Sequence, residues 1–174
     1  MLVFGAQKTY LSKGPGHTPK MRYLNFFFPD CRFICTTRPP EQVIPSAISL
    51  FVRFCEVYHT PYHTGDLIER TIAMADYWYP HPLEVFKDME ENRQVVIQYR
   101  TMIHTISQSV SAIYKKLGLV VSKDFYVFLL NQEAQQYQSN HKYSAEKYGL
   151  NANEISIRYK SSYVGLLEKS VHGN

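Results

Sequence analysis

The chain has 174 residues, 45% of them hydrophobic, which is enough for one domain, residues 1–174, with a sizeable core. Its net charge of +4 suits a small anionic ligand, but it is too low and too evenly spread to indicate binding to duplex nucleic acid. No apolar run approaches the roughly 18 residues of a membrane span, so no membrane segment is expected in this chain.

The N-terminal residues predict a strand that ends at residues 8–12, followed by a turn at residues 13–16. A short helix is expected next, with Thr18 as its N-cap and Pro19 as its first residue. Its buried side is expected to carry three apolar residues, Met21, Leu24 and Phe28.

Residues 33–37 form a short, β-prone and nearly uncharged run, which predicts a second strand. A strand, a helix and a strand in this order make a right-handed crossover between parallel strands. Lys13 and Arg38 would then both leave the carboxyl edge of the sheet, where two cations suit an anionic substrate.

The second strand runs directly into a long helix. Pro39 and Pro40 cannot extend a central strand, but a proline suits the first turn of a helix. Apolar residues then recur at helical spacing as far as Tyr58, and the opposite face carries Gln42, Ser46, Ser49 and Arg53. Arg38 at the helix mouth and Ser46 within the next two turns could hold one phosphate between them. A solvated arginine and a surface serine that bind no ligand would show the same spacing, so this alternative stays open.

The rest of the chain predicts four more helices and one more strand. Pro61 breaks the first long helix, so the pair His59 and His63 is not expected to bind a metal. The expected elements are a helix at 66–79 that resumes at 83–89, a strand at 94–99, a helix from 106 that ends at Gly118, a helix from 125 that fades over 131–138, and a last helix opened by Asn151 and Glu154.

The three cysteines, Cys31, Cys35 and Cys55, cannot all pair. Free, buried thiols of a reducing compartment are the better interpretation. The N-terminus also lacks a basic segment followed by an apolar one, so a cytoplasmic location is expected, with an anchor upstream of Met1 left open.

These residues resemble the sulfotransferases that use 3′-phosphoadenosine-5′-phosphosulfate (PAPS) as the sulfuryl donor. The most specific part of the resemblance is the block from Phe28 to Ile34 with Arg38-Pro39 and Val43-Ile44-Pro45-Ser46. Further similarity lies in Tyr10–Pro15, Val95–Tyr99, Ile113–Leu119, His141–Ser144 and Tyr148–Leu150. Within the segment Tyr10–Pro15, Gly14 stands where asparagine, serine or aspartate is commoner.

The resemblance implies an α/β fold, namely a partial three-layer P-loop-like sulfotransferase fold with a short parallel sheet flanked by helices and a helical C-terminal half. It implies that Arg38 and Ser46 bind the 3′-phosphate of the donor, with Lys13 beside them. It also offers His17 as the base that takes the proton of an acceptor hydroxyl, although a histidine that merely caps or packs a turn fits the spacing as well. The acceptor class, the oligomeric state and the identity of the base are not specified by the residues.

The family's phosphosulfate loop, a turn rich in Lys, Ser, Gly and Thr, has no counterpart in the sequence. We therefore expect the chain to be the C-terminal part of a longer enzyme or a truncated relative, and to be inactive alone.

Two other classes of protein fit the same elements. One is a non-enzymatic α/β interaction module, which an ion pair between Arg38 and Glu41 or Glu56 would favour. The other is a different nucleotide-dependent transferase, such as a kinase of related architecture.

Overall fold

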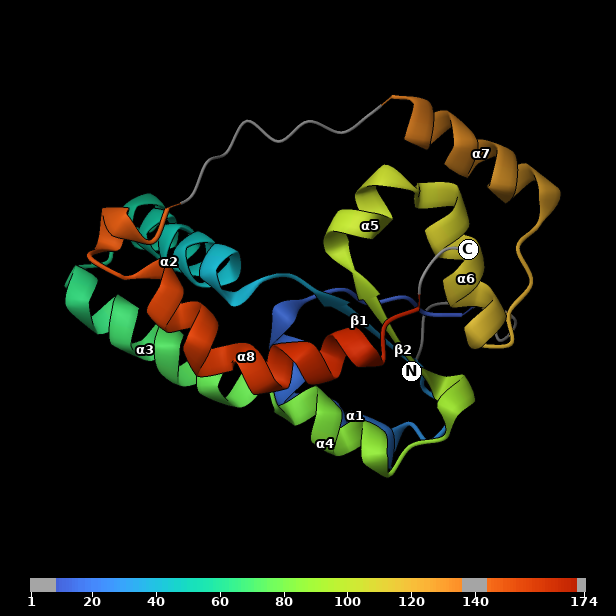
Figure 1. The fold of residues 1–174 in the computed structure, drawn as a ribbon, viewed down its shortest axis with the longest axis horizontal. Coiled ribbons are helices and arrows are strands. Elements are labelled where there is room, and N and C mark those ends of the chain that lie inside the picture. The colour runs from blue at the N-terminus through green and yellow to red at the C-terminus, as the bar shows by residue number, and fades with distance from the viewer. Residues whose placement is uncertain (1–8, 136–143, 172–174) are drawn as a thin grey trace.

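The computed structural model describes residues 9–135 and 144–171. It is a mixed α/β structure in which helices surround a short parallel sheet of two strands, as the resemblance implies (Figure 1). The elements in chain order are η1 (Pro15–Lys20), α1 (Met21–Phe27), β1 (Phe33–Thr37), α2 (Pro40–Val57), α3 (Thr64–Trp78), α4 (His81–Lys87), η2 (Glu91–Arg93), β2 (Gln94–Gln98), α5 (Tyr99–His104), α6 (Ile106–Lys116), α7 (Lys123–Ala134), η3 (Glu146–Tyr148) and α8 (Ala152–Glu168).

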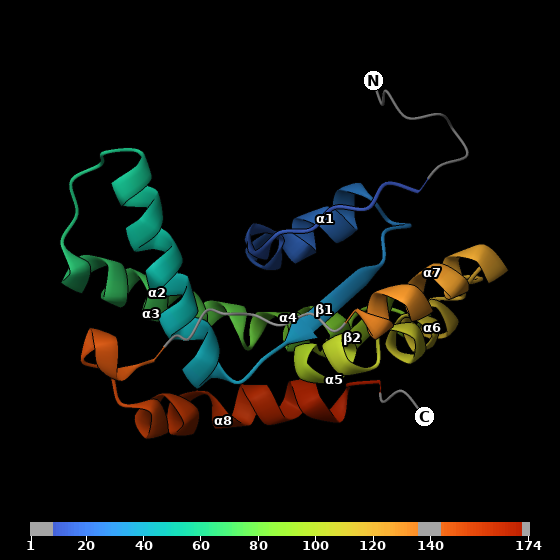
Figure 2. The same cartoon turned by 90° about the horizontal axis from the view of Figure 1, so that it is seen from above.

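The two strands pair in parallel over their whole length, from Phe33 opposite Gln94 to Thr37 opposite Gln98. Ser170 forms an isolated bridge to Val96 at the other edge of β2, and the amide of Val171 donates to the Val96 carbonyl at 2.9 Å. Within the described residues no strand covers the outer edge of β1. Figure 2 shows α8 along one side of the sheet and α1 on the opposite side.

Two apolar cores lie on this framework. The larger one packs α2, α3, α4 and α8 together and includes Ile44, Ile48, Phe86 and Leu166. The smaller one joins β2 to α6 and includes Val95, Ile97 and Ile113. Burial on both sides explains why β2 reads as a continuous apolar run.

Local signals in the sequence placed most helix ends correctly. The Asn151 side chain accepts hydrogen bonds from the amides of Asn153 and Glu154 at the start of α8, as the capping pattern predicts. The predicted cap of α6 is confirmed, because Gly118 has a φ of 65° just beyond its end. At the end of α2 a non-glycine residue, His59, takes this left-handed conformation with a φ of 49°.

Three predictions for the N-terminal part are wrong. Residues 9–12 form no strand, and Lys8 lies outside the described residues. Thr18 is not an N-cap, because η1 runs directly into α1 and neither helix begins with a side-chain cap. Phe28 is not buried but 55% exposed. The apolar spacing of α1 was interpreted as a stripe facing the core, whereas Met21 is its buried residue.

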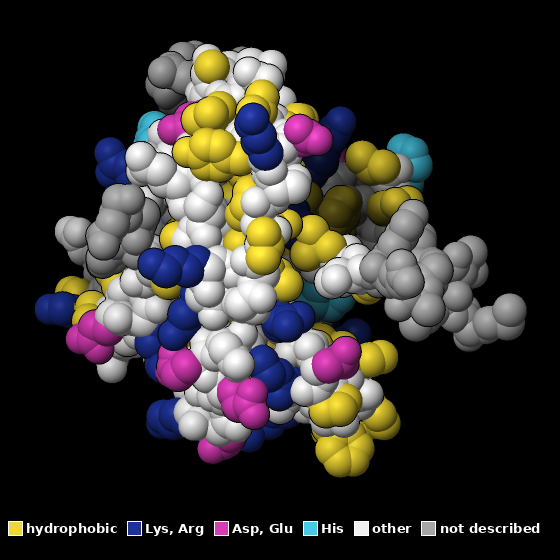
Figure 3. All heavy atoms as spheres, turned by 90° about the vertical axis from the view of Figure 1, so that its right-hand side faces the viewer, with side chains coloured by type: hydrophobic (Ala, Val, Ile, Leu, Met, Phe, Trp, Pro, Cys, Tyr) yellow, Lys and Arg dark blue, Asp and Glu magenta, His cyan; other side chains and the backbone are white. Residues whose placement is uncertain are grey.

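Several large apolar side chains are exposed to solvent. Figure 3 shows hydrophobic side chains at the top of one face, where α7 lies, and at its lower right, over α1. The exposed residues on these helices include Phe26 and Phe27 on α1 and Val127, Phe128 and Leu130 on α7. In the part of the chain that the structure describes, no helix has both the length and the apolar character needed to cross a bilayer.

His81 is a buried histidine at the start of α4 and is only 2% exposed. Its ring stacks on Tyr77 with 4.5 Å between centroids, and its Nδ1 atom lies 3.8 Å from the Glu84 carboxylate. Burial lowers the pKa of His81, and the nearby charge of Arg22 lowers it further, while Glu84 opposes the shift. The imidazole is therefore held in its neutral form.

The free energy of unfolding is expected to depend on pH through His81. The folded pKa lies below the unfolded value of about 6.5, so the unfolded chain binds more protons between these two values. The contribution of His81 to stability should therefore be fully present above about pH 6.5 and be lost as the pH falls from there through the lowered pKa. Urea unfolding from pH 5 to 7.5 measures this slope, which should largely disappear in His81→Gln. An equal slope in that variant would assign it to other groups.

Candidate functional site

Arg38 lies at the carboxyl end of the sheet, where β1 and β2 finish level with each other. Thr37 pairs with Gln98, so the next residue on each strand, Arg38 and Tyr99, are neighbours. The Arg38 guanidinium lies over the Tyr99 ring, with its Cζ atom 4.9 Å from the centroid. Figure 1 shows α2 and α5 leaving the sheet from these two ends. A cation and an aromatic ring therefore meet at one edge of the sheet.

The guanidinium has no anionic partner within residues 9–135 and 144–171. Glu56, one of the two carboxylates considered as a partner, lies instead 3.4 Å from Arg53. Glu41 is in the first turn of α2 and forms no ion pair in the described part of the chain. Half-buried Arg38 is therefore available to an external anion, and the ion pair that would favour an interaction module is not found.

Helix α2 presents its N-terminus beside Arg38. Its N-cap is Pro39, which provides no side-chain cap, so first-turn amides lack the usual side-chain acceptor. Ser46 is half-buried on the same helix and lies about 9 Å along the axis from Pro40 at 1.5 Å per residue. Its hydroxyl forms no hydrogen bond within the described residues. The amides of Gln42 and Val43 donate to the Pro39 carbonyl at 3.0 and 3.1 Å, so the Glu41 amide and the Ser46 hydroxyl are the donors that this helix leaves for an anion in the described structure.

Thr37 adds an unsatisfied buried hydroxyl next to Arg38. The residue is 5% exposed, and its Oγ1 atom has no hydrogen-bond partner in the part of the chain that the structure describes. Leaving such a group unpaired costs about 1–3 kcal/mol. The end of β1 thus carries a buried hydroxyl without a partner among the described residues, directly before Arg38 in the chain.

Tyr79, at the end of α3, contacts the backbone of Arg38. Its hydroxyl donates a hydrogen bond of 3.1 Å to the backbone carbonyl of Arg38. Its ring packs against Tyr159, with 5.3 Å between centroids. The contacts of Tyr79 and Tyr99 with Arg38 were not predicted. The position of Tyr99 at the end of a strand was a usable signal, but the contact of Tyr79 joins segments 41 residues apart and leaves no local pattern.

Lys13 and His17 lie in a different setting from the one predicted. Because residues 9–12 are not a strand, Lys13 does not leave the carboxyl end of a strand beside Arg38, and it is exposed. His17 is in η1, where its Nε2 atom and the Ser12 hydroxyl are 2.9 Å apart. In the described residues no hydrogen bond or ion pair connects Lys13 or His17 to Arg38 or Ser46.

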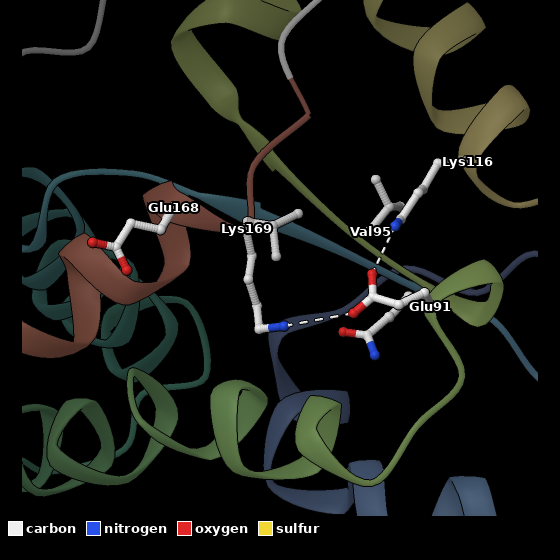
Figure 4. A pocket seen from close by; sticks show the side chains of 7 residues that line it. Glu91, Val95, Lys116, Glu168 and Lys169 are labelled. Carbon is white, nitrogen blue, oxygen red and sulfur yellow. Dashed lines mark hydrogen bonds and ion pairs between the residues drawn. The ribbon is translucent and has the colours of Figure 1, made fainter.

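A hollow of about 300 Å³ lies at the other end of β2, and its lining includes Glu91, Lys116, Glu168 and Lys169. Figure 4 shows Glu91 between the two lysines, at 2.6 Å from Lys116 and 3.9 Å from Lys169. One carboxylate therefore engages both ammonium groups. These ion pairs link the end of α8 to η2 and α6. Both lysines of the hollow are thus paired with Glu91 rather than free for an anionic ligand.

The cysteines are free thiols, as expected, but all three are half-buried rather than buried. Burial raises the pKa of the Cys35 thiol to about 11. Among the residues that the structure describes, no group of three or more His, Cys, Asp or Glu side chains is placed to hold a metal ion.

The sequence matches the family described as the sulfotransferase family over residues 3–123. The chain belongs to the sulfotransferase family. It is also 25% identical over 164 residues to "Omega-hydroxy-beta-dihydromenaquinone-9 sulfotransferase Stf3" of Mycobacterium bovis, and to the protein of the same name in Mycobacterium tuberculosis. Each alignment covers 90% of this chain and 39% of the relative.

This sulfotransferase-family chain therefore spans well under half the length of these curated relatives. No solved structure matches it. The family match includes β1, the start of α2, β2 and α6, so it covers Arg38, Ser46 and Tyr99. It confirms the predicted resemblance at the family level. The segment His141–Tyr143, which was part of that resemblance, lies outside the described residues.

Proposed function

We propose that this chain provides the 3′-phosphate site for PAPS in an enzyme that transfers a sulfuryl group to an acceptor hydroxyl. The observation that carries the proposal is the position of Arg38, which has no ion pair in the described part of the chain, between the uncapped start of α2 and the Tyr99 ring. The family to which the chain belongs supports the sulfuryl chemistry.

The groups would hold two parts of the nucleotide, the 3′-phosphate and the base. The Arg38 guanidinium offers a planar fork that fits two phosphate oxygens, and the Ser46 hydroxyl can donate to a third. The partial positive charge at the start of an 18-residue helix favours the same anion. The Tyr99 ring offers an apolar face on which an aromatic base could stack.

When bound, PAPS would supply the sulfuryl group. The acceptor hydroxyl must lose its proton as its oxygen bonds to sulfur and adenosine 3′,5′-bisphosphate leaves, and we propose the His17 imidazole as the base and Lys13 as a cation near the donor. Full turnover by a His17→Gln variant of the longer enzyme would remove that role from His17. The relatives are named for a hydroxylated menaquinone, but for this chain we propose only that the acceptor carries a hydroxyl group.

The proposal is tested by the preference for nucleotides. The purified protein is expected to bind adenosine 3′,5′-bisphosphate about 10-fold or more tightly than adenosine 5′-phosphate, because only the former carries the 3′-phosphate that Arg38 and Ser46 would hold. Isothermal titration calorimetry at constant ionic strength measures both affinities. Equal affinities would contradict a 3′-phosphate site.

A further inference from the structure

The Arg38 peptide lies at a point where the backbone has few hydrogen bonds to hold it. The ladder between β1 and β2 ends at Thr37 and Gln98. The next two residues, Pro39 and Pro40, have no N–H groups. The Tyr79 hydroxyl, 3.1 Å from the Arg38 carbonyl, gives this peptide a fixed contact with α3.

Tyr79 is itself held rigidly. It is 8% exposed at the end of α3, and its ring packs against Tyr159 of α8. The Tyr159 hydroxyl donates to the Asp76 carboxylate at 2.9 Å. Arg158 donates two hydrogen bonds to the same carboxylate, at 2.9 and 2.7 Å. These contacts join α3 to α8 and fix the ring that reaches Arg38.

A peptide held through its carbonyl has a fixed direction for its Cα–Cβ bond. The Arg38 guanidinium is anchored at its far end by the Tyr99 ring. The side chain is therefore constrained at both ends, by Tyr79 through the backbone and by Tyr99 at the guanidinium. Because the side chain is already restrained, it loses less rotamer entropy when it binds an anion, and binding therefore costs less free energy.

We propose that Tyr79 is a positioning residue for Arg38: its hydroxyl fixes the backbone from which the guanidinium reaches a 3′-phosphate. The inference rests on the proposed function of Arg38 and adds a residue that acts on Arg38 through its backbone carbonyl. Burial raises the pKa of the Tyr79 phenol, which keeps the hydroxyl protonated as a donor.

The test is Tyr79→Phe, which keeps the ring and removes the donor. Its affinity for adenosine 3′,5′-bisphosphate is expected to fall about 3- to 10-fold, the scale of one lost hydrogen bond. Its affinity for adenosine 5′-phosphate, which has no 3′-phosphate, should stay within twofold. Combined with Arg38→Ala, the substitution should add no further loss, because its effect passes through the arginine.

The matched control is Tyr77→Phe, which removes a hydroxyl from the same helix; this hydroxyl lies 3.4 Å from His81 Nε2 and has no described bond to Arg38, Tyr79 or Tyr159. It should leave both nucleotide affinities unchanged. Equal losses for the two nucleotides, or failure of Tyr79→Phe to fold, would show a general structural role and overturn the inference. If Arg38→Ala alone leaves bisphosphate binding unchanged, the proposed function fails first. If only Tyr79→Phe has no effect, the positioning role alone fails.

Discussion

Replacing Arg38 by alanine is expected to weaken the binding of adenosine 3′,5′-bisphosphate by about 1.5–3 kcal/mol, or roughly 10- to 150-fold in Kd. This is the scale of a hydrogen bond to a charged group. In the described structure Arg38 has no carboxylate partner, so its removal leaves no protein charge unpaired there, and the loss should appear in binding rather than in stability. Isothermal titration calorimetry measures the affinity, and thermal unfolding monitors the fold.

The matched control for this variant is Arg53→Ala, on the same helix but ion-paired with Glu56 at 3.4 Å. This exposed pair contributes little to stability, and its loss should leave the affinity within twofold. Arg38→Lys should fall between the wild type and Arg38→Ala, because an ammonium keeps the charge but loses the fork. Unchanged affinity in a folded Arg38→Ala protein would contradict the assignment of Arg38.

Replacing Phe86 by alanine is expected to lower the free energy of unfolding by about 3–5 kcal/mol, because burial of the ring is lost and a cavity remains. Phe86 is 2% exposed in the larger core. For a chain of this length the melting temperature should fall by about 10 °C. Differential scanning calorimetry measures the change.

Phe27→Ala provides the comparison for this core variant. The Phe27 ring is 68% exposed on α1, so its removal should change stability by no more than about 0.5 kcal/mol. Similar losses of stability in the two variants would mean that the exposed face of α1 is covered in solution and that burial does not distinguish Phe86 from Phe27.

The segment from β1 into α2 could be predicted because its signals are local. The β-prone run that ends at Thr37, the two prolines and the helical spacing after them each act within a few residues. The position of Arg38 at a strand end and a helix start followed from them. The Asn151 cap is local in the same sense.

Long-range contacts were not predictable in this way. The neighbour of β1 is β2 rather than residues 9–12, and strand partners depend on contacts that no short window contains. The proximity of Arg38 to Tyr99 follows from that pairing. The Tyr79 hydroxyl reaches Arg38 only because α3 packs beside α2.

The parallel pairing of β1 with β2 also has a consequence for the order of assembly during synthesis. The two strands are separated by about sixty residues, so they can meet only after α2, α3 and α4 have been made. Helices α2 and α3 are adjacent in sequence and in contact, and they can pair while later residues are still within the ribosome. The neighbourhood of Arg38 and Tyr99 therefore arises late, and a nascent chain that ends before β2 lacks it.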